Sequence, residues 1–382
     1  MTSKPSTAVH RRHMQHALAL AANARGRTSP NPMVGAVLVH SGEVVGEGWH
    51  SHAGAPHAEA LALASAGSHA RGATLYVTLE PCAHHGRTPP CSDALIAAGV
   101  REIYAAVADP NPLVNGRGTA MLRAAGITTH VGLCEPEARQ LNQPFFKLMT
   151  HSLPYVTAKF AASLDGKIAT RNGNSQWITG PAARDYGHTL RDCTDAILVG
   201  AGTVVADDPQ LTTRLADKTR NPKHPLRVIV DSRGRVPASA RVFDAALPGK
   251  AALATTDLVN PELRDALRHK GIEVWQLPAD TGGRVHLPSL MTELGRREHL
   301  SVLAEGGAQL LGALFDYKLV DRVCVFLAPL VIGGSSAPSA VGDPGALSLH
   351  DAVRLSPLHV QTLGTDLCIE ADVISNLTPA AQ

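Results

Sequence analysis

The chain has 382 residues, of which 44% are apolar, so it is too long for a single ordinary core and too apolar for disorder, and two globular domains are expected. Its net charge of +2, with lysine and arginine scattered along the chain, gives no sign of an extended nucleic-acid surface. It has no run of about 18 apolar residues and no apolar core behind its polar, basic segment 1–15, so neither a membrane span nor a secretory signal is predicted and we expect a cytoplasmic protein.

The first part of the chain alternates between helical and strand patterns. In chain order we expect a helix over 11–25, strands over 33–39 and 44–49, a helix from Pro56 to about Ala66, a strand over 74–79, a helix near 91–98, a strand near 102–107, a helix near 118–125 and a strand near 127–132. This order predicts a layered α/β domain.

The second part repeats the alternation. A helix over 135–152 leads into the turn at 151–154, where we place the boundary between a domain over 1–150 and a domain over 151–382. After a strand over 155–160, we expect strands near 196–199, 226–231, 251–254, 272–275, 301–304 and 322–328, and helices near 181–191, 260–270 and 307–315. Both halves are therefore predicted to be α/β with largely buried sheets.

Residues with the chemistry of a metal site lie in the first domain. His57 opens a helix, Cys82 follows a strand and Cys91 comes nine positions later. One imidazole and two thiolates suit tetrahedral zinc, and a site with three protein ligands leaves the fourth position open for water, as catalytic sites do. Glu59 would take a proton from that water and deliver it to a ring nitrogen and then to the leaving amine. The pattern predicts a deaminase with one zinc ion per chain and Glu59 as its catalytic acid and base.

The spacing of the two cysteines departs from the zinc-deaminase signature H-x-E followed by P-C-x-x-C, because eight residues separate them. The insert contains His84 and Arg87, which we expect to bind a phosphate or another polar group of the substrate. His84 or His85 in place of Cys91, in a closed structural site, is an alternative that would leave Glu59 without a task. Asn31 is a candidate hydrogen-bond partner for a ring edge, with an ordinary turn asparagine as the alternative.

Two glycine-containing turns stand out in the second domain, at 200–202 and 306–307. Each follows a buried strand pattern and precedes a helix, where backbone amides can approach a pyrophosphate. A G-x-G-x-x-G fingerprint is missing because Val205 stands at the third glycine position, so a Rossmann domain is not supported. Neither turn is specific on its own, because most glycine-containing turns of this kind are ordinary chain reversals.

Motifs occur in a fixed order along nearly the whole chain. They are P-N-P-M-V-G (30–35), H-A-E (57–59), T-L-E-P-C-A-H-H-G-R-T-P-P-C (78–91), A-S-L-D-G-K (162–167), S-Q-W-I-T-G (175–180), G-x-x-T-V-V-A-D-D-P-Q-L-T-T-R (200–214), V-D-S (230–232) and A-E-G-G (304–307). Together they closely resemble the bifunctional deaminase/reductase family of riboflavin biosynthesis.

The resemblance implies a cytidine-deaminase-like three-layer α/β/α domain followed by a dihydrofolate-reductase-like α/β domain. It also implies two reactions. Zinc-dependent deamination would convert 2,5-diamino-6-ribosylamino-4(3H)-pyrimidinone 5′-phosphate to 5-amino-6-(5-phosphoribosylamino)uracil, and NADPH would then reduce the ribosyl group to ribityl. The partner would be this small phosphoribosyl pyrimidine, with no nucleic acid and no membrane, and we expect a homo-oligomer, dimeric or larger.

Residue roles in the second domain follow from the same resemblance. Carried over by motif, the residues that hold NADPH are Ala161, Trp177, Thr203, Asp207, Ser232, Gly307, Ala308, Gln309 and Leu310. Those on the substrate side are Ser175, Arg191, Leu211, Arg214 and Glu305, with the two arginines expected on the 5′-phosphate. Lys159 and Asp207 are candidate proton donors, each with a structural or solvated role as the alternative.

Two other functions remain open at this point. A tRNA adenosine deaminase would share the zinc site, but the mild charge and a second half without an RNA-binding pattern count against it. A non-enzymatic binding protein with structural zinc would not need Glu59.

Overall fold

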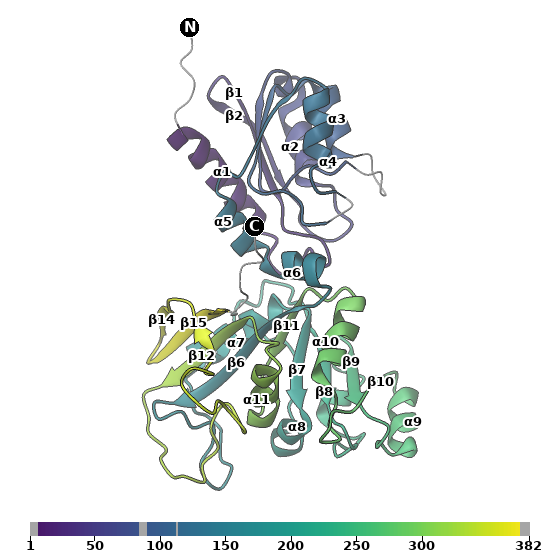
Figure 1. Cartoon of the computed structure of the whole chain (residues 1–382), viewed down its shortest axis with the longest axis vertical. Helices are drawn as coiled ribbons and strands as arrows, with labels where there is room; N and C mark the ends of the chain where they lie inside the picture. The colour runs from purple at the N-terminus through teal and green to yellow at the C-terminus, as the bar shows by residue number, and fades with distance from the viewer. Residues whose placement is uncertain (1–6, 84–89, 112–113, 375–382) are drawn as a thin grey trace. The chain divides into compact units, whose positions relative to one another are not determined.

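The structure is a computed structural model that describes residues 7–83, 90–111 and 114–374, and the chain divides into two compact units, Met1–Ser152 and Leu153–Gln382 (Figure 1). Both units are built on an α/β sheet, which confirms the predicted class. Among the described helices, none combines the length and the apolar composition that crossing a membrane requires.

The first unit is a three-layer α/β/α sandwich. Its elements are α1 (Thr7–Ala22), β1 (Gly35–His40), β2 (Glu43–Trp49), α2 (Ala58–Ala66), β3 (Thr74–Val77), α3 (Cys91–Ala98), β4 (Glu102–Ala105), α4 (Arg117–Ala124), β5 (Thr128–Val131), α5 (Glu135–Leu141) and α6 (Gln143–His151). The sheet order is β2-β1-β3-β4-β5, antiparallel at β1 and parallel from β3 to β5. Helices α2, α3 and α4 cover one face, and α1 and α5 lie on the other (Figure 1).

Helix α2 lies unusually close to the sheet, which fixes the place of its first residues. A Cβ at Gly46 would collide with the carbonyl oxygen of Ala62, and one at Gly48 would collide with the side chain of Leu61. Only glycine at these positions of β2 lets the helix backbone approach the strand. The start of α2, which carries His57 and Glu59, is therefore held against the sheet.

The second unit has a larger sheet. Its elements are β6 (Tyr155–Ser163), α7 (Pro181–Asp192), β7 (Ala196–Gly200), α8 (Ala201–Asp207), β8 (Leu226–Val230), β9 (Ala251–Thr255), α9 (Pro261–His269), β10 (Glu273–Gln276), α10 (Leu287–Arg296), β11 (Ser301–Ala304), α11 (Ala308–Asp316), β12 (Arg322–Ala328), β13 (Arg354–Leu355), β14 (His359–Leu363) and β15 (Asp366–Ile374). The order is β10-β9-β8-β7-β11-β6-β12-β15-β13, with β14 paired to β15. Strands β6 to β12 run parallel, so their carboxyl ends share one edge, where ligands of α/β sheets bind.

Three predicted features differ from the structure. The single helix expected over 135–152 is two helices, because Pro144 stands in the first turn of α6 and Asn142 leaves the helical path between them. Helix α10 was missed, although Leu287, Leu290, Met291 and Leu294 follow helical spacing and are buried. No strand was predicted after 322–328, so the antiparallel strands β13, β14 and β15 were missed, and because β13 and β14 are mostly exposed, that end of the sheet is not buried as expected.

Candidate active sites

The predicted metal ligands of the first unit lie together. One ligand atom each from His57, Cys82 and Cys91 falls within 4.8 Å of the others. His57 Nδ1 is 3.2 Å from Cys91 Sγ and 3.7 Å from Cys82 Sγ. Tetrahedral zinc, with Zn–N of about 2.0 Å and Zn–S of about 2.3 Å, holds such N and S atoms roughly 3.5 Å apart. The donor set and its spacing therefore fit zinc.

Helix starts and a strand end place these ligands. His57 directly precedes α2, Cys91 is the first residue of α3, and Cys82 follows β3 through a short extended segment. The Cys91 amide donates to Cys82 Sγ over 3.2 Å. Hydrogen bonding from the Cys91 thiol holds the pKa of Cys82 well below its usual range, which favours the thiolate form.

Glu59 lies buried in the first turn of α2, and its oxygens are not part of the described group of ligand atoms. Burial is the main cause that raises its pKa above the ordinary value. A carboxyl group with a raised pKa holds a proton more readily, as a group that accepts a proton and passes it on must do. Glu59 thus interacts with the three predicted metal ligands without being one of them.

The loop that carries Asn31 reaches the region of the predicted metal ligands through a contact with His50. This histidine was not predicted from the sequence. Asn31 Nδ2 lies 3.1 Å from Nε2 of His50, and His50 Nδ1 lies 3.2 Å from the Pro56 carbonyl oxygen. Burial lowers the pKa of His50, so the ring is neutral, and this pair of contacts fits a proton on Nδ1. The His50 and His57 rings are 5.7 Å apart. The position of His50 directly after β2, which pairs with β1, was the available signal.

A side chain distant in sequence holds this loop. Buried Asn142 accepts a hydrogen bond from the Met33 amide and donates one to the Met33 carbonyl oxygen, both over 2.8 Å. The two bonds satisfy both backbone groups of one residue of the P-N-P-M-V-G loop. The remaining predicted contacts of this site, His84 and Arg87, lie outside the described residues.

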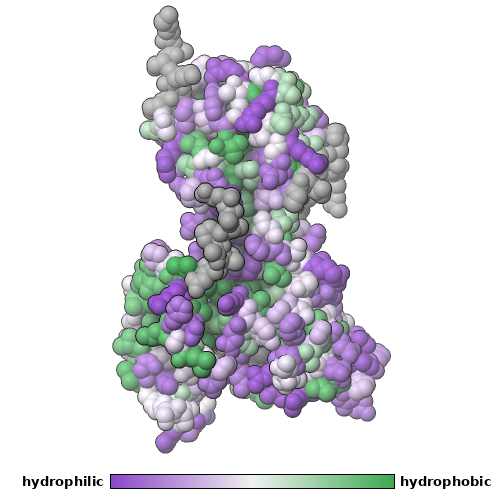
Figure 2. Space-filling model, in the orientation of Figure 1, coloured by the Kyte–Doolittle hydropathy of each residue, from purple (hydrophilic) through white to green (hydrophobic). Residues whose placement is uncertain are grey.

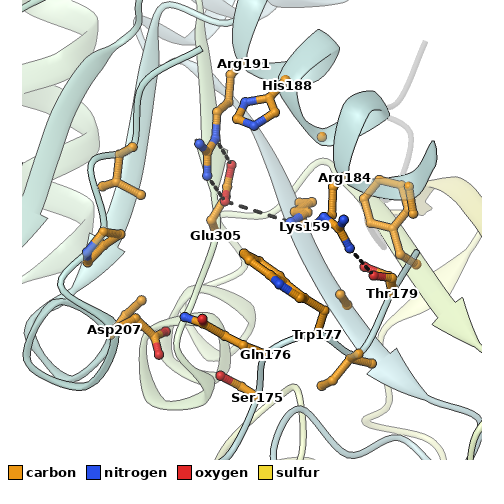
Figure 3. A pocket seen from close by; sticks show the side chains of 18 of the residues that line it. Lys159, Ser175, Gln176, Trp177, Thr179, Arg184, His188, Arg191, Asp207 and Glu305 are labelled. Atoms are coloured by element: carbon orange, nitrogen blue, oxygen red, sulfur yellow. Dashed lines mark hydrogen bonds and ion pairs between the residues drawn. The ribbon is translucent and has the colours of Figure 1, made fainter. Parts of the chain in front are cut away.

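The second unit contains a cavity of about 760 Å³, a size common for cofactor and substrate sites (Figure 3). It opens beside strands β6, β7 and β11. Sequence-predicted residues that line it are Lys159, Ala161, Ser175, Trp177, Arg191, Thr203, Asp207, Leu211, Arg214 and Glu305.

The other predicted cofactor residues lie outside this lining. Gly307 directly precedes α11, and a Cβ placed on it would lie 3.2 Å from Oγ1 of Thr203, so the segment from Gly307 to Leu310 adjoins the cavity wall. Ser232 follows β8 at the same edge of the sheet, and its hydroxyl accepts a hydrogen bond from the Val285 amide. These positions lie along the same carboxyl edge of the sheet, beyond the cavity.

A buried ion pair occupies the wall of the cavity. Arg191 donates from Nε and Nη2 to the two carboxylate oxygens of Glu305, over 2.7 and 2.8 Å, and Lys159 Nζ lies 3.8 Å from the same carboxylate (Figure 3). Burial alone would raise the pKa of Glu305, but Arg191 and Lys159 outweigh it and lower the pKa to about 2. Arg191 also donates to the Thr212 carbonyl oxygen. Its guanidinium group is thus held by contacts within the protein, and its expected contact with a phosphate stays a prediction.

Arg214 and His188 lie beside this pair. Arg214 Nη1 donates to Oγ1 of Thr212 over 2.9 Å, and its backbone amide donates to Nδ1 of His188. Burial, with help from the two arginines, lowers the pKa of His188 to about 4, so this ring is uncharged at neutral pH. Burial also raises the pKa of Asp207. The cavity therefore combines fixed positive charge with a neutral imidazole.

Helix α7 supplies lining residues that the sequence analysis did not name. Arg184 and His188 stand at helical spacing from Arg191, at i, i+4 and i+7, and all three line the cavity. The Arg184 guanidinium lies 4.7 Å from the centre of the Trp177 ring, and its Nη1 donates to the Thr179 carbonyl oxygen (Figure 3). This shared helix face was the signal that would have identified them.

Comparison with known proteins addresses both units. Residues 7–107 match the cytidine and deoxycytidylate deaminase zinc-binding region, and residues 154–369 match the RibD C-terminal domain. The chain is 42% identical to the riboflavin biosynthesis protein RibD of Aquifex aeolicus, over 94% of this chain and 98% of that protein. It is 44% identical to RibD of Escherichia coli, over 94% of this chain and 97% of that one. This chain belongs to the RibD family.

Solved structures of RibD proteins have the same fold as this chain. RibD of Acinetobacter baumannii superimposes with a TM-score of 0.87 at 37% identity, covering 97% of this chain and all of that one. A diaminohydroxyphosphoribosylaminopyrimidine deaminase/5-amino-6-(5-phosphoribosylamino)uracil reductase from Thermotoga maritima gives a TM-score of 0.83 at 34% identity, covering 96% and 99%. The predicted family and fold are confirmed, and the chain is a bifunctional enzyme of riboflavin biosynthesis with a deaminase and a reductase domain.

Proposed function

We propose that the first unit of this RibD-family chain hydrolyses the 2-amino group of 2,5-diamino-6-ribosylamino-4(3H)-pyrimidinone 5′-phosphate, and that the second unit then reduces the ribosyl group of the product with NADPH. The observation that carries the proposal is that each family domain has its own assembled cluster: three zinc-ligand atoms beside Glu59 in one, and a charged cavity in the other.

In the deaminase unit, His57, Cys82 and Cys91 would hold zinc, which supplies a water molecule of lowered pKa. Glu59 accepts one proton from the attacking water at its carboxylate and delivers it to the ring nitrogen, and it then carries the second proton of that water to the departing amine, which leaves as ammonia. Asn31, oriented by neutral His50, donates to the edge of the pyrimidine. Burial of Glu59 keeps these proton transfers away from bulk solvent.

In the reductase unit, Trp177, Thr203 and the turn at Gly307 would hold NADPH, which supplies the hydride. Arg214 is the arginine we propose for the 5′-phosphate, since Arg191 is occupied by Glu305. Lys159 lies between Glu305 and the ring of Phe326, with Nζ 5.4 Å from the ring centre. We propose that its ammonium donates a proton as the ribose ring opens.

The direct test is incubation of the purified chain with the diaminopyrimidine phosphate, with and without NADPH. We expect the uracil product in both cases and the ribityl product only when NADPH is present. A ribityl product that never forms would remove the reductase half of the proposal, and an unchanged pyrimidine would remove the deaminase half.

Arg214→Leu tests the assignment of the phosphate contact. The change is expected to raise the KM of the reductase for the phosphorylated uracil about 10- to 100-fold, because a charge-assisted hydrogen bond contributes roughly 1.5–3 kcal/mol. The KM for the same compound without its phosphate should change less than about twofold. Equal effects on the two substrates in steady-state assays would contradict the assignment.

Asn142→Ala tests the support of the Asn31 loop. The change leaves the amide and carbonyl groups of Met33 unpaired, so the free energy of unfolding of this unit should fall by about 2–3 kcal/mol. The KM for deamination should rise about tenfold while the zinc content stays unchanged, and Thr150→Ala, at an exposed position of α6, serves as the control. Calorimetry and kinetics measure both effects; an unaltered KM would mean that the loop needs no such support.

We also propose that the chain forms homo-oligomers. Figure 2 shows apolar side chains over the region of β14 and β15, where Val353, Leu358, Val360 and Ile374 are exposed. Exposed apolar surface along antiparallel outer strands is typical of association sites. Light scattering should give a mass at least twice that of one chain, and a monomer at micromolar concentration would contradict this proposal.

A further inference from the structure

A buried carboxylate stands two residues before the zinc ligand Cys82 and is not used in the proposed chemistry. Glu80 is 3% exposed. Its Oε1 accepts hydrogen bonds from the amide and the hydroxyl of Thr119, over 2.9 and 3.1 Å, and its Oε2 accepts from the amides of Gly116 and Asp109, over 3.0 and 3.3 Å. Both oxygens thus accept hydrogen bonds from residues that are distant in the sequence. Neither oxygen belongs to the described group of metal-ligand atoms.

These contacts make Glu80 a cap for α4 that comes from another part of the chain. Gly116 precedes this helix and has no side chain with which to cap it. The first amides of a helix need an acceptor, and a carboxylate there also interacts favourably with the helix dipole. In return, the amides compensate the charge of a buried carboxylate. The helix start and the segment before Cys82 therefore hold each other.

Backbone packing makes this contact close. A Cβ on Gly118 would collide with the carbonyl oxygen of Pro81, the residue between Glu80 and Cys82. On the other side, Cys82 is bound by α3, because Ser92 donates from both its amide and its hydroxyl to the Cys82 carbonyl oxygen. The backbone from 80 to 82 is thus fixed between two helix starts.

We propose that Glu80 is a positioning residue of the metal centre: by fixing this backbone against α4, it holds Cys82 Sγ in place for zinc binding with His57 and Cys91. The inference rests on the proposed zinc site. Groups that orient a ligand in this way change metal affinity about 10- to 100-fold when they are replaced. Glu80 does not contact substrate, so its effect on the reaction passes through the metal.

Glu80→Gln is the sharpest test, because the side chain keeps its shape while one acceptor oxygen becomes an amide NH2 group that faces two hydrogen-bond donors. In the full-length protein, we expect zinc to transfer to a chromophoric chelator about 10–100 times faster than from the unchanged protein. Deaminase kcat should fall when zinc is limiting and recover in excess zinc, with KM little changed. Reduction of supplied uracil intermediate should be unaffected, which shows that the reductase unit is folded, and recovery of deamination in excess zinc shows that the deaminase unit is folded.

Two control variants separate positioning from loss of fold. Thr119→Val removes only the hydroxyl donor, so zinc release should accelerate by about two- to threefold. Asp195→Asn alters a carboxylate that accepts from the amides of Leu300 and Ser301 in the other unit, and should leave zinc release unchanged. If Glu80→Gln does not fold, Thr119→Val becomes the test. Zinc release from Thr119→Val that is as slow as from the unchanged protein would then overturn the proposal.

The outcomes distinguish this inference from the proposed function. An unchanged protein that binds no zinc would overturn both. Zinc in the unchanged protein, with the same release rate from folded Glu80→Gln, would overturn the positioning role alone. Loss of deamination from Glu80→Gln with zinc release unaltered and no recovery in excess zinc would also overturn it.

Discussion

Glu59→Gln is expected to lower the rate of deamination by about 10²–10⁴-fold, because the amide can neither accept the proton of water nor deliver it to the departing amine. Zinc should remain bound at close to one ion per chain, since the described ligand atoms come from His57, Cys82 and Cys91. Reduction of supplied uracil intermediate should proceed at the unchanged rate. Product analysis and metal analysis of the same sample measure all three quantities.

The matched control for this change is Asp93→Asn. Asp93 is a carboxylate in the first turn of α3, close in sequence to Cys91 and outside the described group of ligand atoms. Deamination by this variant should stay within about threefold of the unchanged protein. Deamination that survives Glu59→Gln, or zinc that is lost with it, would show that Glu59 does not have the role assigned to it.

Glu305→Gln is expected to have the largest effect in the other unit. The change leaves Arg191 buried without its carboxylate partner and removes the charge beside Lys159. Breaking one partner of a buried ion pair costs about 3–5 kcal/mol, and an amide that still accepts a hydrogen bond should bring the loss to the lower end of that range. Reduction should fall at least about 100-fold, because the charges that line the cavity change, while deamination should persist.

The pH dependence of this effect has a definite sign. The pKa of Glu305 in the folded chain is about 2, below the ordinary value for glutamate, so its contribution to stability is present above the ordinary pKa and is lost as pH falls toward 2. The difference in free energy of unfolding between the unchanged chain and Glu305→Gln should therefore be full at pH 7 and shrink below about pH 4. Denaturant titrations across this range measure it.

Glu293→Gln provides the comparison for Glu305→Gln. Glu293 also pairs with two basic side chains, Arg296 and Arg297, but within one surface helix and its end. Such a pair contributes about 0–1 kcal/mol, so neither activity should change. Equal stability losses for the two glutamate variants, or reduction within twofold of normal for Glu305→Gln, would contradict the role of the buried pair.

The zinc site was predictable because its chemistry is local. His57, Cys82 and Cys91 stand at helix starts and a strand end, positions that sequence patterns identify, and the H-x-E and P-C motifs name the chemistry. The contacts that support the site were not predictable in this way. Glu80 meets its partners 29, 36 and 39 positions later, and Asn142 meets Met33 across 109 positions, through packing that leaves no local pattern.

In the reductase unit, the motifs identified residues that line the cavity but not the ion pair that two of them form. Arg191 and Glu305 are 114 positions apart, and their ion pair depends on α7 lying beside the end of β11. The sequence alone does not show this ion pair. An arginine that is expected near a phosphorylated substrate is then assigned to the phosphate. Helical periodicity along α7 would have added Arg184 and His188 from the sequence alone.

The most direct test of two active sites in one chain is a single reaction in water enriched in ¹⁸O with NADPH deuterated at both C4 positions. We predict that the ribityl product carries one heavy oxygen on the pyrimidine, from hydrolysis, and one deuterium on the former ribosyl carbon, from hydride transfer. Glu59→Gln should yield no product with the heavy oxygen. A doubly labelled product would confirm the account by mass spectrometry, whereas a ribityl product that lacks either label would contradict it.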